Sequence, residues 1–235
     1  MDKEKLRAFI VEKINPEVTE ETLDKFLRYE ALLKEWNSRF NLTATKSEED
    51  VLVKHFIDSI YPISYIDFKE KDTLIDIGSG AGFPGVCLAL MLSGVRFTLV
   101  ESNKKKVSFL EELVKVLELK NVEVLCARAE TLTKFRESFD YCSARAVSQL
   151  NILLELGVPL LKVNGKFLAY KGSMVDFEIK DAKRALHLLS AEIEEKYTYN
   201  LPYIPDGRSL LVIRKRKPTE KKYPRSYSLI NNKPL

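Results

Sequence analysis

The first third of the chain carries apolar residues at helical spacing. They recur every three, four or seven positions over residues 23–40, and Thr19 stands before them as a candidate N-cap. Ser47 and Asp50 have the spacing of a capping box, which predicts another helix just after them. The pattern therefore predicts a helical extension over residues 1–70.

Beyond residue 72 the pattern changes to short β-rich runs that alternate with amphipathic stretches. The runs predict strands at residues 73–77, 95–101, 122–127, 139–144, 166–170, 196–200 and 210–214. The amphipathic stretches predict helices at residues 84–92, 104–117, 149–161 and 176–195. Such alternation is typical of a doubly wound α/β fold, with a mainly parallel seven-stranded sheet covered by helices on both faces. The last strand follows turn residues 205–207, so we expect it to be antiparallel.

Length and composition limit the class of protein. A chain of 235 residues that is 45% hydrophobic can bury one sizeable core. We expect an α/β domain over residues 71–217 and a basic C-terminal tail over residues 218–235. No apolar run reaches the roughly 18 residues of a membrane span, and the charged start MDKEKLRAFI does not resemble a secretory signal. The sequence predicts a soluble cytoplasmic protein without a membrane partner.

The three cysteines give no sign of a disulfide or a metal site. Cys87, Cys126 and Cys142 lie far apart, and each is in an otherwise apolar stretch, which is typical of free thiols in a core. We therefore expect no metal.

Positive charge is concentrated in two places. Residues 214–235 contain eight basic side chains and one acidic one, although the whole chain carries only +4. This segment either binds phosphates, with Tyr223 and Tyr227 available to stack on bases, or is a solvated tail. Lys104 to Lys106 open a predicted helix, where the helix dipole disfavours cations. Phosphate contact and a solvated charge run are both open there.

The strongest local motif is DIGSGAGFPG, residues 76–85, which follows the first predicted strand and precedes a helix. Glycines in this position let the backbone approach a ligand closely. The motif, with Gly80 in it, fits either a dinucleotide or S-adenosylmethionine. The carboxylate of Asp76 would repel a pyrophosphate and attract a sulfonium or an ammonium group, which favours S-adenosylmethionine.

Three further positions lie at the ends of predicted strands, where such sheets bind ligands. Glu101 ends the second strand 23 residues after Gly78, where a carboxylate can accept both ribose hydroxyls of either cofactor. Ala129 and Glu130 follow the third strand and can line an adenine, although Glu130 also suits a helix start. Arg145 ends the fourth strand and can bind the methionine carboxylate, a substrate phosphate or a surface acid.

Missing motifs narrow the chemistry. The chain has no Asn-Pro-Pro-Tyr or Asp-Pro-Pro-Tyr segment to hold an exocyclic amine, and no Pro-Cys pair to attack a pyrimidine. These absences argue against methylation at base amines or at pyrimidine carbon 5. A ring nitrogen with a free lone pair needs neither device. There are only two histidines, and His55 is the one we consider for a pocket.

Several motifs together resemble the RsmG family, also called glucose-inhibited division protein B. They are WNSRFNLTA, LVKHFIDSI, DIGSGAGFPG, VES at 100–102, RAE at 128–130, SARAV at 143–147, AYKG at 169–172 and KYPR at 222–225 with a terminal KPL. The resemblance implies a class I methyltransferase that transfers a methyl group from S-adenosylmethionine to N7 of a guanine. The implied target lies in the decoding-region hairpin of 16S rRNA, the product is S-adenosylhomocysteine, and the partner is 16S rRNA or the small ribosomal subunit.

The resemblance also implies roles for particular residues. With Asp76 and Gly80 from the glycine loop, the expected cofactor contacts are Gly78, Phe83, Glu101, Ser102, Asn103, Ala129, Glu130 and Arg145. The motifs that we expect to face RNA contain Asn41, Thr43, His55, Lys171 and Arg225. The tail departs from the family at SYSLINN, residues 226–232, where members often carry a glycine and prolines.

Two hypotheses about function remain at this point. The first is a monomeric rRNA guanine-N7 methyltransferase that needs no catalytic general base. The second is a nucleotide-dependent oxidoreductase, or a nucleoside-binding regulator without catalysis, on the same fold.

Overall fold

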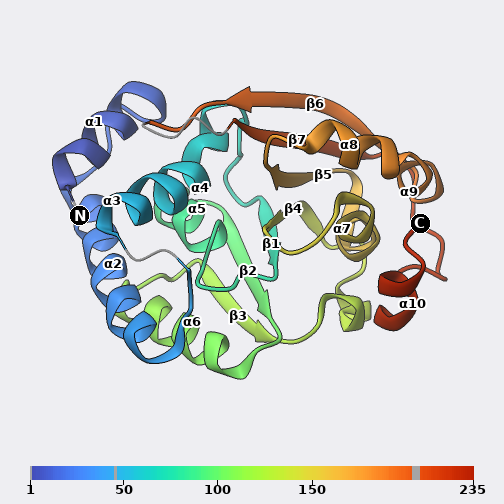
Figure 1. Ribbon diagram of the computed structural model, residues 1–235, viewed down its shortest axis with the longest axis horizontal. Coiled ribbons are helices and arrows are strands. Elements are labelled where there is room, and N and C mark those ends of the chain that lie inside the picture. Colours follow the sequence, from blue (N-terminus) through green and yellow to red (C-terminus); the bar gives the residue numbers. More distant parts are fainter. Residues whose placement is uncertain (1, 45–46, 203–206) are drawn as a thin grey trace. The chain divides into compact units, whose positions relative to one another are not determined.

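The computed structural model describes residues 2–44, 47–202 and 207–235 (Figure 1). The chain divides into two compact units, which we describe separately. The first unit consists of Met1–Lys71 with Ser79–Cys126, and the second of Asp72–Gly78 with Ala127–Leu235. The N-terminal helices thus share a unit with the strands and helices of residues 79–126, and residues 218–235 belong to the second unit.

The strands form a seven-stranded sheet in the order β3-β2-β1-β4-β5-β7-β6. Strands β1 and β4, β2 and β3, and β4 and β5 pair in parallel, whereas β7 is antiparallel to both β5 and β6. This order confirms the predicted doubly wound α/β fold with an antiparallel last strand. Of the turn predicted at residues 205–207, Pro205 and Asp206 lie outside the described residues.

The first unit contains most of the helices. Its elements are α1 (Lys3–Lys13), α2 (Glu20–Phe40), α3 (Glu48–Asp50), η1 (Val51–Ile57), α4 (Asp58–Ile60), η2 (Tyr61–Ser64), α5 (Gly85–Met91), β2 (Arg96–Glu101), α6 (Lys104–Val116) and β3 (Val122–Cys126). Helix α2 begins as predicted, because the Thr19 hydroxyl accepts a hydrogen bond from the N–H of Thr22. It buries Leu23, Phe26 and Tyr29 completely and contacts both α5 and α6.

The predicted helix after Ser47 is interrupted by a π-helical segment. Ser47 caps α3 by accepting from the N–H of Asp50, as predicted, and the chain continues as the π-helix η1 before α4. Val51, Leu52 and Val53 are consecutive and all buried, so this segment is covered on more than one side. His55 lies in this segment. Within the described residues no helix has the length and apolar character needed to cross a membrane.

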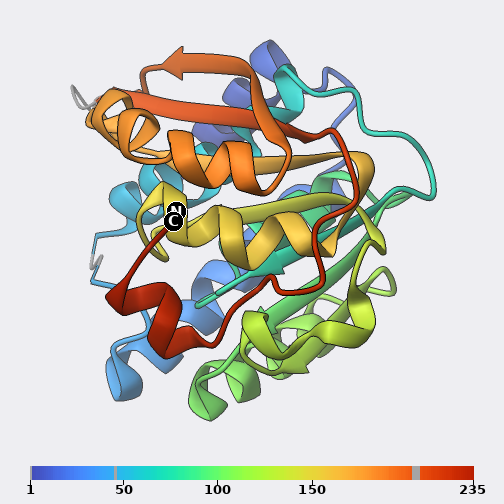
Figure 2. The same ribbon diagram turned by 90° about the vertical axis from the view of Figure 1, so that its right-hand side faces the viewer.

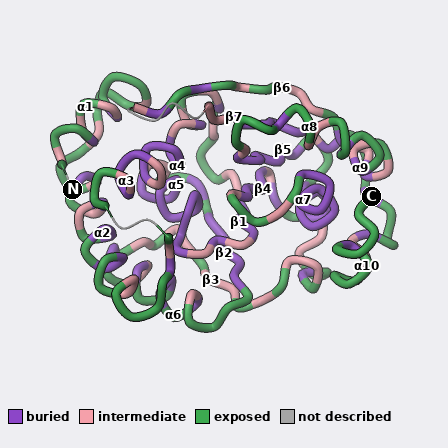
Figure 3. Tube along the Cα trace, viewed as in Figure 1, coloured by how far each residue is buried: buried purple, intermediate pink, exposed green. Residues whose placement is uncertain are grey.

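The second unit is organised around a buried helix. Its elements are β1 (Thr73–Ile77), η3 (Ala129–Thr131), η4 (Thr133–Phe135), β4 (Phe139–Arg145), α7 (Leu150–Gly157), η5 (Val158–Leu160), β5 (Leu161–Lys171), α8 (Val175–Asp181), α9 (Lys183–Leu188), β6 (Ala191–Tyr199), β7 (Arg208–Lys215) and α10 (Tyr227–Asn232). Every residue of α7 is buried, and Figure 3 shows this helix in the colour of buried residues. It contacts β4, β5, α8, α9 and α10, so it forms the centre of this unit.

One predicted helix is wrong in its second half. The pattern predicted a single helix over residues 176–195, but α8 and α9 end by Leu188 and strand β6 begins at Ala191. β6 is an edge strand of the sheet. Its solvent-facing side carries Glu and Lys residues, which also favour helices. A positive φ of 53° at Ser190 separates the two elements.

The C-terminal residues pack against the second unit instead of forming a solvated tail. Figure 2 shows this segment running beside α7, and its helix α10 contacts α7. Tyr223, Ile230 and Leu235 are buried. The Arg136 guanidinium donates to the carbonyl oxygens of Thr219, Glu220 and Tyr223. The solvated-tail interpretation is therefore wrong for most of this segment.

Ion pairs occupy most of the basic side chains of residues 214–235. The paired ones are Arg214 with Glu194, Lys215 with Glu137, Arg216 with Glu192, Lys222 with Glu220, and Arg225 with Glu155. Among the described residues, only Lys217, Lys221 and Lys233 of this segment have no ion-pair partner. The charge run is thus largely neutralised within the protein.

One cysteine also differs from expectation, because Cys126 is exposed whereas Cys87 and Cys142 are buried.

Lys215 is the most deeply buried of these cations. Its side chain is fully buried, and Nζ donates to Glu137 Oε1 at 2.9 Å and to the Leu161 carbonyl at 2.8 Å. Burial lowers the pKa of Lys215, more than the hydrogen bond to Glu137 raises it. Burial raises the pKa of Glu137, but hydrogen bonds from Lys215 and the Thr219 N–H outweigh it and hold that pKa below 4.5.

We expect Glu137→Gln to lower the free energy of unfolding at pH 7 by about 1–3 kcal/mol, because a buried ammonium loses its charged partner. The folded-state pKa of Glu137 is depressed, so its contribution is complete above pH 4.5 and is lost as the pH falls through the folded value. The difference between wild type and variant should therefore shrink from pH 7 to acid pH. Urea unfolding across this range measures it, and a difference that stays constant with pH would contradict the assignment.

Candidate functional site

In the first unit, the carboxylate of Glu101 links the glycine loop to the end of β2 through hydrogen bonds. Glu101 Oε1 accepts from the N–H groups of Ser102 and Asn103, each at 2.8 Å, and Oε2 accepts from the N–H of Gly80 at 3.0 Å. Glu101 is only 8% exposed. Its carboxylate therefore sets the shape of the loop, and Oε2, with a single donor among the described residues, retains the capacity to accept a hydroxyl.

Helix α2 holds the same loop from another direction. The Tyr29 hydroxyl donates to the carbonyl oxygen of Ala81 at 2.5 Å. The Phe83 ring stacks on Tyr29, with centroids 5.3 Å apart, and on His55, with centroids 4.6 Å apart. The interplanar angles are 14° and 17°. Phe83 thus contacts rings from both α2 and the π-helical segment, which fixes the loop against the N-terminal helices.

Two glycines have a backbone conformation and a close neighbour that together disfavour any residue with a Cβ atom. Gly82 has a φ of 93°, and a Cβ there would lie 2.6 Å from the Tyr29 hydroxyl. In the second unit, Gly78 has a φ of 70°, and a Cβ would lie 2.7 Å from Val147 Cγ2. Both positions combine a left-handed backbone with a close neighbour, so the glycines are needed for the fold of the loop as well as for any ligand.

Asn103 begins α6 immediately beside the Glu101 carboxylate. Its Oδ1 accepts from the N–H groups of Lys105 at 2.9 Å and Lys106 at 3.4 Å. Ser102 and Asn103 are both exposed. Of the predicted cofactor contacts, the structure thus brings Gly80, Glu101, Ser102 and Asn103 into one hydrogen-bonded group, with Phe83 in the same loop.

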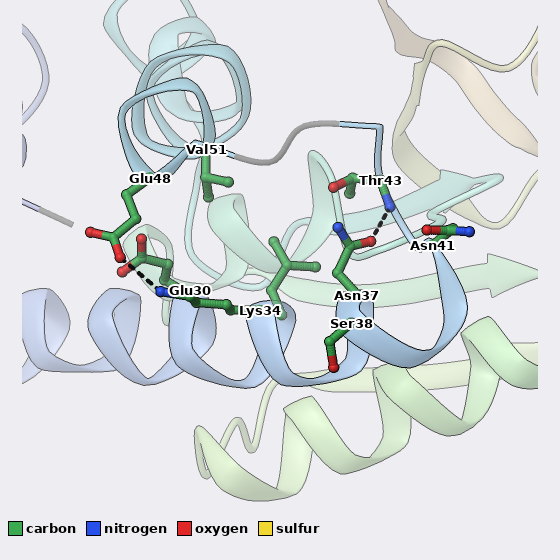
Figure 4. A pocket seen from close by; sticks show the side chains of 9 residues that line it. Glu30, Lys34, Asn37, Ser38, Asn41, Thr43, Glu48 and Val51 are labelled. Carbon is green, nitrogen blue, oxygen red and sulfur yellow. Dashed lines mark hydrogen bonds and ion pairs between the residues drawn. The ribbon is translucent and has the colours of Figure 1, made fainter.

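A cavity of about 320 Å³ lies at the C-terminal half of α2 (Figure 4). Its lining residues are Glu30, Leu33, Lys34, Asn37, Ser38, Asn41, Thr43, Glu48 and Val51. Asn37 Oδ1 accepts from the N–H of Thr43 at 2.8 Å, and Lys34 pairs with Glu48 at 3.0 Å. Asn41 ends α2 in the left-handed conformation, with φ 47°. Two residues that we predicted to face RNA, Asn41 and Thr43, therefore share one cavity.

The other predicted cofactor contacts belong to the second unit. Asp76 is completely buried, and its Oδ1 accepts from the Ser143 hydroxyl at 2.7 Å. Arg145 is the last residue of β4, as predicted. Ala129 and Glu130 lie in the 3-10 turn η3 after β3. The Asp76 carboxyl group is thus enclosed by the protein and hydrogen-bonded to Ser143.

Lys171 and Arg225 are held by carboxylates of the protein. Lys171 Nζ donates to Glu178 at 2.6 Å and to the Ser148 carbonyl at 2.8 Å, and its side chain is 7% exposed. Arg225 binds the carboxylate of Glu155, whose side chain is fully buried. To contact RNA, each cation would have to leave its partner, so the structure gives both a packing role.

Tyr29 is the residue that sequence reasoning missed. It lies on the apolar face of α2 between Phe26 and Leu33, and a fully buried tyrosine needs an acceptor for its hydroxyl. That requirement was the available signal. Nothing in the sequence shows that the acceptor is Ala81, 52 residues away.

The fold is that of class I S-adenosylmethionine-dependent methyltransferases. Among similar solved structures is that of M. jannaschii TYW2 in complex with AdoMet, which is 17% identical and has a TM-score of 0.53. The match covers 63% of this chain and 70% of that one. The YcgJ protein from Bacillus subtilis is 15% identical with a TM-score of 0.54, over 69% of this chain and 100% of its own.

At the level of sequence the similarity is far higher. Residues 22–200 match the GidB family, described as rRNA small subunit methyltransferase G. The Ribosomal RNA small subunit methyltransferase G of Oceanobacillus iheyensis is 42% identical over 221 residues, 93% of each chain. The protein of that name from Alkaliphilus oremlandii is 39% identical over 225 residues, 94% of each chain. The chain belongs to the rRNA small subunit methyltransferase G family, which confirms the resemblance seen in the motifs.

Proposed function

We propose that the protein transfers a methyl group from S-adenosylmethionine to N7 of a guanine in the decoding-region hairpin of 16S rRNA. Family membership and the class I fold support methylation of small-subunit rRNA. The observation that carries the cofactor assignment is the Glu101 carboxylate, which holds the glycine loop through Gly80 and keeps acceptor capacity on Oε2 for a ribose hydroxyl. The position of the target nitrogen rests on the family resemblance.

The residues around the loop fit this cofactor. Exposed Ser102 and Asn103 follow Glu101 directly, and Asp76 places a buried carboxyl group at the end of β1. A negative charge there suits a sulfonium and an ammonium group and disfavours the pyrophosphate of a dinucleotide. The rival oxidoreductase hypothesis therefore has both the family match and this carboxyl group against it.

The proposed chemistry requires positioning rather than proton transfer. S-adenosylmethionine supplies an activated methyl group and leaves as S-adenosylhomocysteine. Guanine N7 carries an exposed lone pair, so no proton must be removed before attack and no general base is needed. The protein contributes by holding the reactants in line at close distance. We place this reaction in the cytoplasm, on a monomeric enzyme that acts on 16S rRNA or on the small subunit.

The proposal predicts that replacing the target guanine by 7-deazaguanine abolishes methyl transfer, because the accepting nitrogen is then a carbon. The assay uses purified protein, labelled S-adenosylmethionine and small subunits reconstituted with modified or unmodified 16S rRNA. Binding of both RNAs is measured separately to confirm that only the chemical step differs. Methylation of the 7-deaza RNA at the same base would contradict the N7 assignment. Calorimetric titration with S-adenosylmethionine and NAD tests the cofactor, and tight binding of NAD alone would favour the rival class.

A further inference from the structure

An exposed aromatic ring stands at the C-terminal end of α2. Phe40 is 41% exposed. Trp36, one turn earlier, packs against Phe40 with ring centroids 5.3 Å apart and against Phe109 of α6 at 5.7 Å. Its indole N–H donates to Glu112 of α6 at 3.0 Å. Figure 1 shows α2 and α6 side by side. The Phe40 ring therefore packs against an indole that α6 holds in place.

Three lysines are the first three residues of α6, and one of them lies over the Phe40 ring. Lys104 and Lys105 are exposed and Lys106 is half-buried. Within the described parts of the chain none of the three has an ion-pair partner, and Lys105 Nζ lies 5.1 Å from the centroid of Phe40. Cations in the first turn of a helix oppose the helix dipole. The helix dipole opposes this placement, whereas an external anion would be attracted by the lysines and the dipole together.

We propose that Phe40, Lys104 and Lys105 form a docking platform for RNA with unpaired bases. One base stacks on the Phe40 ring, and the phosphates beside it bind Lys104 and Lys105. This inference rests on the proposed function, because it assigns a surface for the same substrate. An aromatic ring among cations matches single-stranded nucleic acid, in which each nucleotide presents a flat base and a phosphate.

When RNA binds, Lys105 and Phe40 exchange their contact with each other for contacts with the RNA. A charge over an aromatic ring at an exposed site is a weak contact, so the lysine leaves readily. When RNA arrives, the ammonium moves to a phosphate and a base takes its place over the ring. The platform follows Ser102 and Asn103 in the chain, and Asn103 caps the helix that carries the lysines. Docked RNA would therefore lie beside the predicted cofactor contacts.

The test compares variants of the full-length protein by fluorescence anisotropy. The probes are a labelled decoding-region hairpin with an unpaired loop and a fully paired RNA duplex of equal length. Phe40→Leu should weaken hairpin binding about tenfold or more and leave its salt dependence unchanged. Lys104→Gln with Lys105→Gln should reduce the slope of log affinity against log salt by about 0.7 for each phosphate that the variant no longer neutralises. The matched control is Lys115→Gln, an exposed lysine in the last turn of the same helix, which should change neither quantity.

Two further measurements separate docking from a purely structural role. Trp36 is the single tryptophan of the chain, so its fluorescence should change as the hairpin binds and reach saturation together with the anisotropy. The lysine variants should unfold at the same or a higher urea concentration, because they relieve repulsion from the helix dipole. Affinity for S-adenosylmethionine should stay unchanged in all three variants.

The outcomes distinguish this surface from the proposed function. If the wild type methylates rRNA but the Phe40 and lysine variants bind the hairpin as it does, the platform is refuted and the function stands. Equal losses of hairpin and duplex affinity in the Phe40 variant would refute base stacking. Binding without any change in Trp36 fluorescence would also refute it. If the wild type neither binds nor methylates small-subunit rRNA, both proposals fail.

Discussion

Arg225→Ala is expected to lower the free energy of unfolding by about 3–5 kcal/mol, the usual cost of removing one partner of a buried ion pair. The carboxylate of Glu155 lies in the buried helix α7 and its side chain is fully buried. It accepts from Arg225 Nε at 2.7 Å, from Nη2 at 2.5 Å and from the backbone N–H at 3.0 Å. Alanine keeps only the backbone donor, which leaves a charged carboxylate in the interior without its cation.

Urea unfolding at pH 7 measures this loss. Arg216→Ala is the matched control, because Arg216 pairs with Glu192 at the surface and should contribute less than about 1 kcal/mol. Replacing both Arg225 and Glu155 by leucine should recover much of the stability, since no charge is then left buried. A normal unfolding free energy for Arg225→Ala, combined with weaker RNA binding, would show that Arg225 serves RNA instead of packing.

Glu101→Gln is expected to weaken S-adenosylmethionine binding by about 10- to 100-fold, although glutamine has nearly the same shape. Hydrogen bonds to a charged group contribute about 1.5–3 kcal/mol each, and Glu101 accepts three of them from backbone N–H groups. A glutamine has only one acceptor oxygen. Its amide N–H₂ must therefore face either Gly80 or the pair Ser102 and Asn103, donor against donor. The loop would then lose the geometry that the cofactor needs.

Isothermal calorimetry with S-adenosylmethionine measures this change, and circular dichroism confirms that the variant is folded. The control is Glu111→Gln, which removes an exposed carboxylate from α6 and should leave the affinity unchanged. An affinity equal to that of wild type in Glu101→Gln would remove this carboxylate from the cofactor site.

The sequence predicted elements wherever burial and local chemistry agreed. Strand β1 and the glycine loop were visible because a buried strand, a run of glycines and a helix start follow one another. Helix α2 was visible because its apolar face repeats over its whole length. Strand β6 was not predicted correctly, because it is an edge strand that exposes one side to solvent. Its charged residues suit a helix equally well.

The same distinction applies to the candidate site, where residues with a local sequence signature were predicted and long-range pairs were not. Glu101 and Gly80 were identified because strand ends and glycine turns have local signatures. The partners of basic residues were not identified, because a charge run looks the same whether it is solvated or paired. Lys215 reaches Glu137, 78 residues away, and Arg225 reaches Glu155, 70 residues away. Only the folded chain brings such pairs together.

The discontinuous first unit has a consequence for biosynthesis. Residues 1–71 leave the ribosome before residues 79–126, yet both segments are needed to complete that unit. Tyr29 can reach Ala81, and Trp36 can pack on Phe109, only after the second segment has been made. At roughly 5–20 residues per second, the apolar face of α2 stays uncovered on the nascent chain for several seconds. During that interval the uncovered apolar face of this helix favours chaperone binding.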